Sequence, residues 1–587
     1  MKLKRTHTCG VLTKADIGKT VILSGWVQRR RDHGGVIFVD LRDREGLTQV
    51  VFNPKISEAV HKTADQLRSE YVISVKGKVD PRPEGMTNLK MKTGEIEVTV
   101  TELELLSISK VLPFVIEDNI DVGEQIRAKY RYLDLRRAPM QYNLIVRHQV
   151  AQVTRQYLSE HGFLELETPF LIKTTPEGAR DFLVPSRLYP GHFYALPQSP
   201  QIFKQLFMIS GFEKYFQIVR CFRDEDLRAD RQPEFTQIDI EMSFVDQDDV
   251  MRLTEGLMAE IFDKAKGMKP KLPFLRLTYA EAMRRFGVDK PDLRFGLELV
   301  DITRDVLNIE FKVFSGVAKS GGLVKGLRIP KTTFSRKDFD DLEKLAAIYG
   351  AKGLAWVKIE NGEWKSPIAK FFKKEEMQHL NTSFSVEEGD AIIFVADQHH
   401  DVVNAALGNI RVHLGKKLKL IDEKIYQFCW VYDFPLFEFD SEEKRWVSKH
   451  HPFTSPKEEH LDWLHTKPEN VLSNAYDLVL NGTEVAGGSI RIHNQTVQSK
   501  VFEALRIGSQ EAQEKFGFLL EALQHGAPPH GGIAVGYDRL MALLCGTESI
   551  RDVIAFPKTQ RGLCLMSDAP SKAEEKQLKE LHLKVTE

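Results

Sequence analysis

The alternation of apolar and polar residues predicts a small β domain at the start of the chain. Residues Glu95–Leu106 alternate cleanly, with Ile96, Val98 and Val100 on one face of the expected strand. Four further runs rich in β-branched and aromatic residues precede it, and one helical stretch lies between the third and fourth: Val21–Val27, Val36–Leu41, Leu47–Phe52, Ser57–Leu67 and Tyr71–Val79. Five short strands in this order favour an OB-fold barrel at residues 1–108.

A helical period follows at about 142–161, where Val146, Val150, Val153 and Tyr157 recur at the spacing of one helix face. Gly162 is well placed to end this helix. Residues 109–140 contain two prolines and a charged stretch, so we expect a hinge or linker there.

Two strands with a polar face are predicted at 215–225 and 235–245. Alternation places Arg223 and Glu225 together on the first. On the second, Phe235, Gln237, Asp239 and Glu241 face one way, opposite Ile238, Ile240 and Met242. Two interpretations stay open: a solvated face of an amphipathic sheet, or a platform for a ligand with a flat base and a phosphate. A phenyl ring among carboxylates and arginines favours the second.

Further along, the pattern predicts one antiparallel-sheet domain in two parts, 141–287 and 423–587, separated by an inserted α+β domain at 288–422. The whole chain is therefore expected to be an α+β multidomain protein. A strand-to-helix passage at Gly531–Leu544 is punctuated by glycines, which let a backbone approach a ligand closely, and Arg539 within it can meet an anion. The tail from Ser571 is polar and predicts a solvated helix.

Composition narrows the class of protein but not its chemistry. No apolar run approaches the ~20 residues needed to span a bilayer, and the five cysteines form no C-x-x-C pair. We therefore expect a cytoplasmic protein without a membrane partner or a disulfide framework. The formal net charge is −1, so any nucleic-acid partner must be held by local basic patches.

Three of these segments resemble, in order and spacing, the signature motifs of class II aminoacyl-tRNA synthetases. They are the 142–161 helix with its following strand to Pro169, the Arg223–Phe235 passage, and Gly531–Leu540. Over essentially the whole chain the resemblance is closest to the bacterial-type aspartyl-tRNA synthetases, in the stretches Gly25–Asp32, Thr175–Asp181, Gln198–Gln201, His450–Thr454 and Arg551–Lys558. One departure is Ala486, where many relatives have glycine and where the extra methyl is expected to tighten the aspartate pocket.

The resemblance implies ATP-dependent attachment of L-aspartate to tRNA(Asp) through aspartyl-adenylate. It implies an ATP site at Arg223, Glu225, Arg231, Phe235, His451, Glu484 and Arg539, of which Arg223, Glu225 and Arg539 are catalytic. It implies Mg²⁺ at Asp477 and Glu484, which offer the carboxylate oxygens that hard cations take. Aspartate would be bound by Glu177, Ser199, Gln201, Lys204, Asp239, His450 and Arg491, although Lys204 and Arg491 alone could equally form surface ion pairs.

The resemblance also implies that the barrel binds the anticodon of the tRNA through Arg29, Arg30, Arg31, His33, Phe38, Gln49 and Gly85. His33 and Gly85 stand where enzymes that charge both tRNA(Asp) and tRNA(Asn) tend to have histidine and glycine. We therefore expect the non-discriminating form, whose Asp-tRNA(Asn) passes to a separate amidotransferase; the alternative is an enzyme for tRNA(Asp) only. A homodimer through the 142–161 helix and Pro169 is also implied. The rivals are another class II synthetase with an OB domain, a non-catalytic RNA-binding protein, and a paralogue that makes free asparagine.

Overall fold

The computed structural model describes residues 1–175 and 178–586. Glu177, expected to contact aspartate, lies outside the described residues. The chain forms two compact units. The first contains residues 1–145 with the short segments 555–559 and 563–570, and the second contains the rest of the described chain. No helix in the described part of the chain is both long and apolar enough to cross a membrane.

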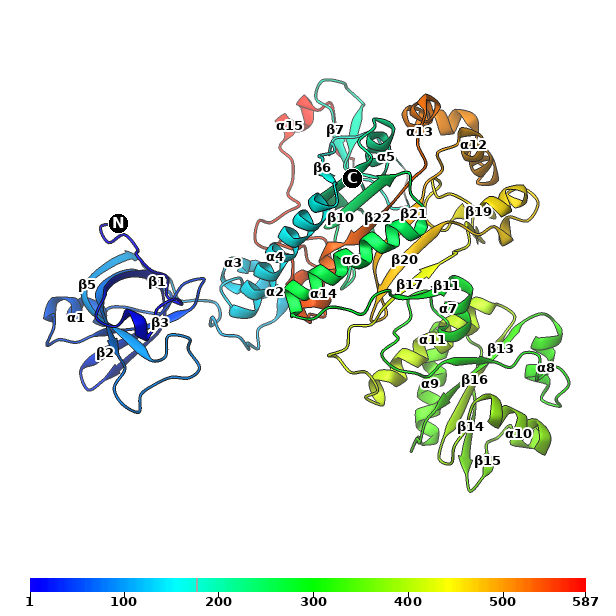
Figure 1. The fold of residues 1–587 in the computed structure, drawn as a ribbon, viewed down its shortest axis with the longest axis horizontal. Coiled ribbons are helices and arrows are strands. Elements are labelled where there is room, and N and C mark those ends of the chain that lie inside the picture. Colours follow the sequence, from blue (N-terminus) through cyan, green and yellow to red (C-terminus); the bar gives the residue numbers. More distant parts are fainter. Residues whose placement is uncertain (176–177, 587) are drawn as a thin grey trace. The chain divides into compact units, whose positions relative to one another are not determined.

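A closed barrel in the order β1-β2-β3-β5-β4 forms most of the first unit (Figure 1). Its elements are β1 (Thr20–His33), β2 (Val36–Arg42), β3 (Leu47–Phe52), α1 (Glu58–Asp65), β4 (Val72–Pro81) and β5 (Ile96–Ser107). The alternating residues Ile96, Val98 and Val100 are buried in its core, because successive side chains of a strand face opposite ways. The predicted strands and helix are confirmed, and β1 continues further than expected, as far as His33.

The segment expected to be a linker is partly helical. It contains α2 (Glu124–Lys129) and α3 (Arg131–Asp134), and α4 runs over Ala138–Glu160. The helix predicted at 142–161 is therefore confirmed but begins earlier, because Pro139 lies in its first turn, where the missing N–H leaves no hydrogen bond unmade. Gly162 follows the helix with φ +82°, as expected for a residue that ends it.

The second unit is built on one sheet in the order β11-β17-β20-β21-β22-β10-β9-β6. Its strands are β6 (Leu164–Glu165), β9 (Lys214–Phe222), β10 (Glu234–Ser243), β11 (Leu275–Thr278), β17 (Phe428–Tyr432), β20 (Ala475–Leu480), β21 (Thr483–Ile490) and β22 (His530–Gly536). Neighbouring strands are antiparallel except at the two edges, where β11 pairs with β17 and β6 with β9 in parallel.

The two faces of this sheet differ in character. On one face α4, α6 (Gln247–Lys266) and α14 (Tyr537–Cys545) pack against a continuous apolar core that includes Ile238 and Ile240 (Figure 1). The other face carries polar side chains, and α5 (Gln201–Ile209) packs there against β10 and β9. The predicted division of strand 235–245 into an apolar and a polar side is confirmed.

The insertion between β11 and β17 has a sheet of its own. After α7 (Tyr279–Phe286), the order β12-β13-β16-β14-β15 is formed by antiparallel pairs, with apolar clusters against its helices. The elements are β12 (Leu299–Asp301), α8 (Lys312–Lys319), β13 (Leu323–Ile329), α9 (Arg336–Ile348), β14 (Ala355–Glu360), β15 (Glu363–Lys365), α10 (Lys374–Ser383), β16 (Ala391–Asp397) and α11 (His400–Lys417). Smaller elements elsewhere are β7 (Leu183–Pro185), β8 (Phe193–Ala195), β18 (Phe437–Asp440), β19 (Arg445–Ser448), α12 (Gln495–Ala504), α13 (Ser509–Ala522) and α15 (Glu575–Glu580).

Candidate active site

A cavity of about 490 Å³ lies on the polar face of the central sheet. Side chains from α5, β10, β20, β21 and the start of α14 line it, together with the loops after β9 and before β20. All the described residues that sequence analysis assigned to ATP, Mg²⁺ or aspartate border this one cavity: Ser199, Gln201, Lys204, Arg223, Glu225, Arg231, Phe235, Asp239, His450, His451, Asp477, Glu484, Arg491 and Arg539. Ala486 borders it too, and is 2% exposed.

Arg223 lies against Phe235 at one end of the cavity. The guanidinium of Arg223 lies 5.1 Å from the centre of the Phe235 ring. Strand β9 ends at Phe222, so the expectation that Arg223 and Glu225 share a strand face is wrong; both lie just beyond it, where the charged loop to β10 begins. Arg231 donates to the Glu225 carboxylate at 3.1 Å. Both side chains line the cavity.

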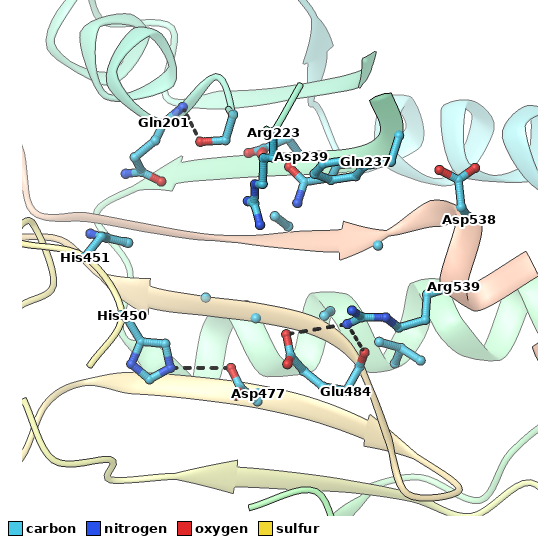
Figure 2. Close-up of a pocket in the computed structure, with 18 of the residues that line it drawn as sticks. Gln201, Arg223, Gln237, Asp239, His450, His451, Asp477, Glu484, Asp538 and Arg539 are labelled. Atoms are coloured by element: carbon cyan, nitrogen blue, oxygen red, sulfur yellow. Dashed lines mark hydrogen bonds and ion pairs between the residues drawn. The ribbon is translucent and has the colours of Figure 1, made fainter. Parts of the chain in front are cut away.

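Arg539 reaches back across the sheet toward β21 (Figure 2). Its Nη1 donates to the backbone oxygen of Glu484 at 2.8 Å. The Nε atoms of Arg223 and Arg539 are both buried, and neither has a hydrogen-bond partner among the described residues. Buried donors without a partner cost stability, so these two guanidinium Nε–H groups suit a ligand rich in acceptor oxygens, such as a polyphosphate.

Two carboxylates, Asp477 and Glu484, lie close together above Gly487. A Cβ atom placed on Gly487 would be 2.9 Å from Asp477 Oδ1 and 3.7 Å from Glu484 Oε1. Burial and the Asp477 charge raise the pKa of Glu484, which Arg539 partly offsets. A pair of carboxylates that repel each other fits a divalent cation, which prefers such oxygens and takes its other ligands from phosphate and water. His450 lies beside this pair, 3.8 Å from Asp477 Oδ1 (Figure 2).

Four buried charges form a cluster at the other end of the cavity, which Lys204, Asp239 and Arg491 border. Lys204 Nζ lies 2.5 Å from Asp239 Oδ1 and 3.2 Å from Glu241 Oε2. Arg491 makes a two-pronged contact with Glu241, at 3.0 Å from Nε and 3.1 Å from Nη2. Each of these four residues is at most 2% exposed. The interpretation of this face as solvated is therefore wrong, and so is the alternative that Lys204 and Arg491 form surface ion pairs.

The neighbouring cations shift the pKa values of the two buried carboxylates to different extents. It raises the pKa of Asp239, although Lys204 works against the rise. For Glu241, burial would also raise the pKa, but Arg491 and Lys204 more than offset it and hold the value at about 2. The second carboxylate oxygen of Asp239, Oδ2, is buried without a hydrogen-bond partner in the described chain. An acceptor of this kind beside paired cations suits an ammonium group.

His451 is tied to the same cluster. Its Nε2 lies 2.9 Å from Arg491 Nη1, and since arginine only donates, this ring nitrogen must accept. Burial, with the Arg491 charge added to it, lowers the pKa of His451 well below its usual value, so the ring is neutral. The expected contact of His451 with the outer phosphates stays a prediction, since the contact observed is with the amino-acid end.

Glu241 and Asp538 are two site residues that sequence reasoning did not assign. Glu241 lies on the polar face with Asp239, and that alternation could have identified it. Asp538 accepts hydrogen bonds from Arg147 and from the Thr236 backbone N–H, the latter at 2.7 Å, and so fixes the start of α14 on β10. Its position next to Arg539 was the available signal.

Two glycines of the 531–544 passage have a different purpose from the one expected. A Cβ atom on Gly532 would lie 2.0 Å from Glu241 Oε2 and 2.1 Å from the Ile240 backbone oxygen. On Gly531 it would lie 2.5 Å from the Ile490 side chain. Gly531 and Gly532 therefore let β22 pack between β10 and β21, whereas Gly536 borders the cavity, where close backbone approach to a ligand stays a prediction.

On the barrel, Phe38 points outward and is half-buried, between the core residues Ile37 and Val39. Opposite it on β1 lies Arg31, which donates to Asp40 at 2.6 Å and to Gln49 at 3.3 Å. Phe38, Arg31 and Asp40 are half-buried on this face of the barrel, and Gln49, which Arg31 contacts, is only 9% exposed.

The other residues expected to read the anticodon differ in their surroundings. Arg30 pairs with Asp65 of α1 at 2.6 Å, so it does not join the surface of Arg31. Arg29, His33 and Gly85 are exposed, and Gly85 has φ +78°. Sequence reasoning missed Glu97, which accepts from Gln49 Nε2 at 2.8 Å and extends the surface of Phe38.

Comparison with known proteins is consistent with this geometry. A family model described as "tRNA synthetases class II (D, K and N)" matches residues 123–560, and one described as "OB-fold nucleic acid binding domain" matches residues 21–106. The chain is 60% identical to the aspartate–tRNA(Asp/Asn) ligase of Geotalea uraniireducens, over 99% of this chain and 98% of that protein. It is 57% identical to the aspartate–tRNA ligase of Macrococcus caseolyticus, again over 99% and 98%.

Solved structures share the fold at lower identity. Asparaginyl-tRNA synthetase from Pyrococcus horikoshii matches with a TM-score of 0.59 at 19% identity, over 95% of this chain and 98% of that one. A putative aspartyl-tRNA synthetase from Leishmania major matches with a TM-score of 0.60 at 19% identity, over 95% and 94%. From the family model and the full-length relatives, this chain belongs to the aspartate–tRNA ligase family of the class II aminoacyl-tRNA synthetases.

Proposed function

We propose that this enzyme joins L-aspartate to tRNA in two steps within the cavity described above. In the first, an oxygen of the aspartate α-carboxylate attacks the α-phosphorus of ATP, the bond to the β-phosphate oxygen breaks, and pyrophosphate leaves. In the second, a ribose hydroxyl of the terminal tRNA adenosine, which we take to be the 3′-hydroxyl, attacks the carbonyl carbon of aspartyl-adenylate. AMP then leaves. The observation that carries the proposal is that two buried arginine Nε–H groups without a partner in the described chain lie at one end of the cavity, and the buried cations Lys204 and Arg491 lie at the other.

At the nucleotide end the side chains would act by positioning ATP and stabilising charge, since catalysis of phosphoryl transfer depends mainly on these two effects. Arg223 would hold the α-phosphate and stabilise the negative charge that develops on it. Phe235 would stack against adenine, Glu225 would contact the adenine edge, and Arg231 and Arg539 would hold the outer phosphates. ATP and Mg²⁺ are the usual requirements of class II synthetases; bound Mg²⁺ would neutralise phosphate charge, held by Asp477 and Glu484.

At the amino-acid end we assign recognition of the aspartate side chain to Arg491 and Lys204, and we assign a further contact with aspartate to His450. Both cations can only donate hydrogen bonds, so a carboxylate satisfies them, whereas the NH₂ group of asparagine would present donors to donors. Asp239 Oδ2 and Gln201 would accept from the α-ammonium, and Ser199 and Glu177 are assigned to the same substrate. His451 would hold Arg491 in place.

Aspartate-dependent ATP–pyrophosphate exchange tests this function. Wild-type protein should exchange label with L-aspartate and not with L-lysine, and much less with L-asparagine. The Arg223→Ala variant should lose about 10²–10³-fold of the exchange rate, the usual cost of removing one preorganised charge donor, while it keeps its affinity for tRNA. No exchange by the wild type would leave only a binding role, and exchange with asparagine at the aspartate rate would overturn the assignment of Arg491 and Lys204.

For the tRNA partner we propose the non-discriminating form, which charges tRNA(Asp) and tRNA(Asn). The anticodons differ at the third base, C against U, whose donor and acceptor edges are exchanged. The proposal rests on His33 and Gly85 and on the name of the Geotalea relative; the Macrococcus relative, named for aspartate–tRNA ligation only, favours the alternative of tRNA(Asp) alone. Charging each transcript with purified enzyme decides: tRNA(Asn) should be charged, and negligible charging would refute it.

Three further assignments go with this proposal. The enzyme would act as a homodimer in the cytoplasm, associated through α4 and the segment ending at Pro169. Asp-tRNA(Asn) would pass to a separate tRNA-dependent amidotransferase, because protein synthesis requires the asparaginyl form. The barrel surface of Phe38, Arg31 and Gln49 would stack on and bond the unpaired anticodon bases.

A further inference from the structure

A chain of hydrogen bonds connects the cavity residue Gln201 to the buried histidine at the start of β22. Gln201 Nε2 lies 3.2 Å from Gln205 Oε1, one turn further along α5. Gln205 Nε2 lies 3.1 Å from His530 Nε2, and His530 Nδ1 lies 2.8 Å from the backbone oxygen of Pro528. Gln205 and His530 are 0% exposed and neither borders the cavity, so they cannot touch a substrate there.

The donor and the acceptor of each hydrogen bond in this series follow from the Pro528 end. The Pro528 carbonyl can only accept, so His530 Nδ1 must carry a proton. Burial lowers the pKa of His530, which keeps the ring neutral, so its Nε2 must accept. The atom of Gln205 that faces Nε2 is therefore the NH₂ group, and its carbonyl oxygen is turned toward Gln201.

The same logic fixes the carboxamide of Gln201, which a solvated side chain could present either way round. Its NH₂ group donates to Gln205, so the carbonyl oxygen is the end left for a ligand. Figure 2 shows the carboxamide of Gln201 directed away from the helix, on the α5 side of the cavity. Asp239 Oδ2, the buried acceptor without a partner in the described chain, borders the same cavity.

We infer that Gln205 and His530 are positioning residues that orient the Gln201 amide so that its oxygen accepts from the α-ammonium of the amino acid. The inference rests on the proposed function, and it adds two residues that act on the substrate only through a third. If Gln205 offers no acceptor, the Gln201 amide can turn over and place its NH₂ group toward the ammonium. That arrangement sets donor against donor, so only ligands that carry the ammonium lose affinity.

The test compares L-aspartate with succinate, which keeps both carboxylates and lacks the ammonium. The variant is Gln205→Met, which conserves length and volume and removes both polar atoms. ATP–pyrophosphate exchange by the full-length enzyme gives the KM for aspartate, the KM for ATP and the inhibition constant of succinate against aspartate. We expect the KM for aspartate to rise about 10-fold to 100-fold, the usual effect of losing one hydrogen bond to a charged group, with the succinate constant and the KM for ATP unchanged.

His530→Asn is the second variant, since it keeps a donor for Pro528 but removes the acceptor that faces Gln205; the aspartate-to-succinate ratio should shift in the same direction. Thr254→Val is the matched control: it also removes one buried hydrogen bond of the same unit, to Val250 at 2.8 Å, away from the cavity, and should leave the ratio alone. Parallel weakening of aspartate and succinate in both variants, or no change in either, overturns the inference. Absence of exchange in the wild type would instead refute the proposed function.

Discussion

Removing the charge of Glu241 is the sharpest perturbation of the buried cluster. The Glu241→Gln substitution keeps the shape of the side chain but leaves Lys204 and Arg491 with Asp239 as their remaining carboxylate partner within the cluster. The pKa of Glu241 is lowered from 4.5 to about 2, and 2.5 pKa units correspond to about 3 kcal/mol of stabilisation of the folded state at neutral pH. Breaking a buried pair by removing one partner costs about 3–5 kcal/mol, so the two routes agree.

The sign of the pH dependence follows from the lowered pKa of Glu241. The stabilisation is fully present above the unfolded pKa near 4.5, and it is lost as the pH falls through the folded value of about 2. Urea unfolding of wild type and Glu241→Gln at pH 7 should differ by about 3 kcal/mol. The variant should also lack the part of the acid destabilisation between pH 4.5 and 2 that Glu241 contributes.

A matched control separates burial from charge removal. Asp248 pairs with Arg276 of β11 at 2.6 Å in the same domain, but its side chain is 50% exposed. Asp248→Asn should therefore cost only about 0–1 kcal/mol. If Glu241→Gln destabilises by less than about 1 kcal/mol, or no more than Asp248→Asn does, then the cluster is not the strongly coupled network described here.

Two further changes probe the packing and the electrostatics around the cluster. Gly532→Ala places a methyl 2.0 Å from Glu241 Oε2 and should destabilise the protein by about 3 kcal/mol or more in thermal unfolding. The control is Gly316→Ala, at an exposed position on α8 where no other described atom lies near the added Cβ. This variant should stabilise the protein by about 0.5–1 kcal/mol. Equal effects would contradict the packing argument. His451→Gln should make the free energy of unfolding less sensitive to acid. Because the pKa of His451 is lowered in the folded protein, only the unfolded state takes up this proton below about pH 6.5. Urea unfolding at pH 7 and pH 5.5 should therefore show a smaller loss of unfolding free energy in the variant than in the wild type, and an equal loss would place the acid sensitivity elsewhere.

The alternation of residues predicted which face of β10 is polar, and the resemblance to a known family predicted fourteen of the side chains that line the cavity, but not Asp538. Alternation could not predict that Lys204 and Arg491 bury Asp239 and Glu241 on this face. Whether Asp239 faces water depends on Lys204 of α5 and on Arg491 after β21, and no local pattern states that residues so far apart in sequence will meet. Partners in three dimensions are set by the packing of whole elements, which a single strand does not encode.

Local signals also failed where two physical effects compete. Pro139 was read as a sign of a linker, yet proline is well tolerated in the first turn of a helix, and α4 begins at Ala138. Alternation predicted a strand that continues past Arg223 to Glu225, but β9 ends at Phe222, where the charged loop begins. In both cases the type of element was predicted and its end was not, because ends depend on tertiary neighbours.

The parallel pairing of β11 with β17 has a consequence for how the chain can change in length. Parallel neighbours cannot be joined by a tight turn, so this edge of the sheet requires a long connection whatever the connection contains. The insertion occupies that connection, and the entropy of closing a loop rises only by about 0.6 kcal/mol for each doubling of its length. Whole modules can therefore be gained, exchanged or trimmed between Thr278 and Phe428 while the register of the two strands is kept. The pairing of β11 with β17 fixes the two ends of the connection, and its length has only a small effect on stability.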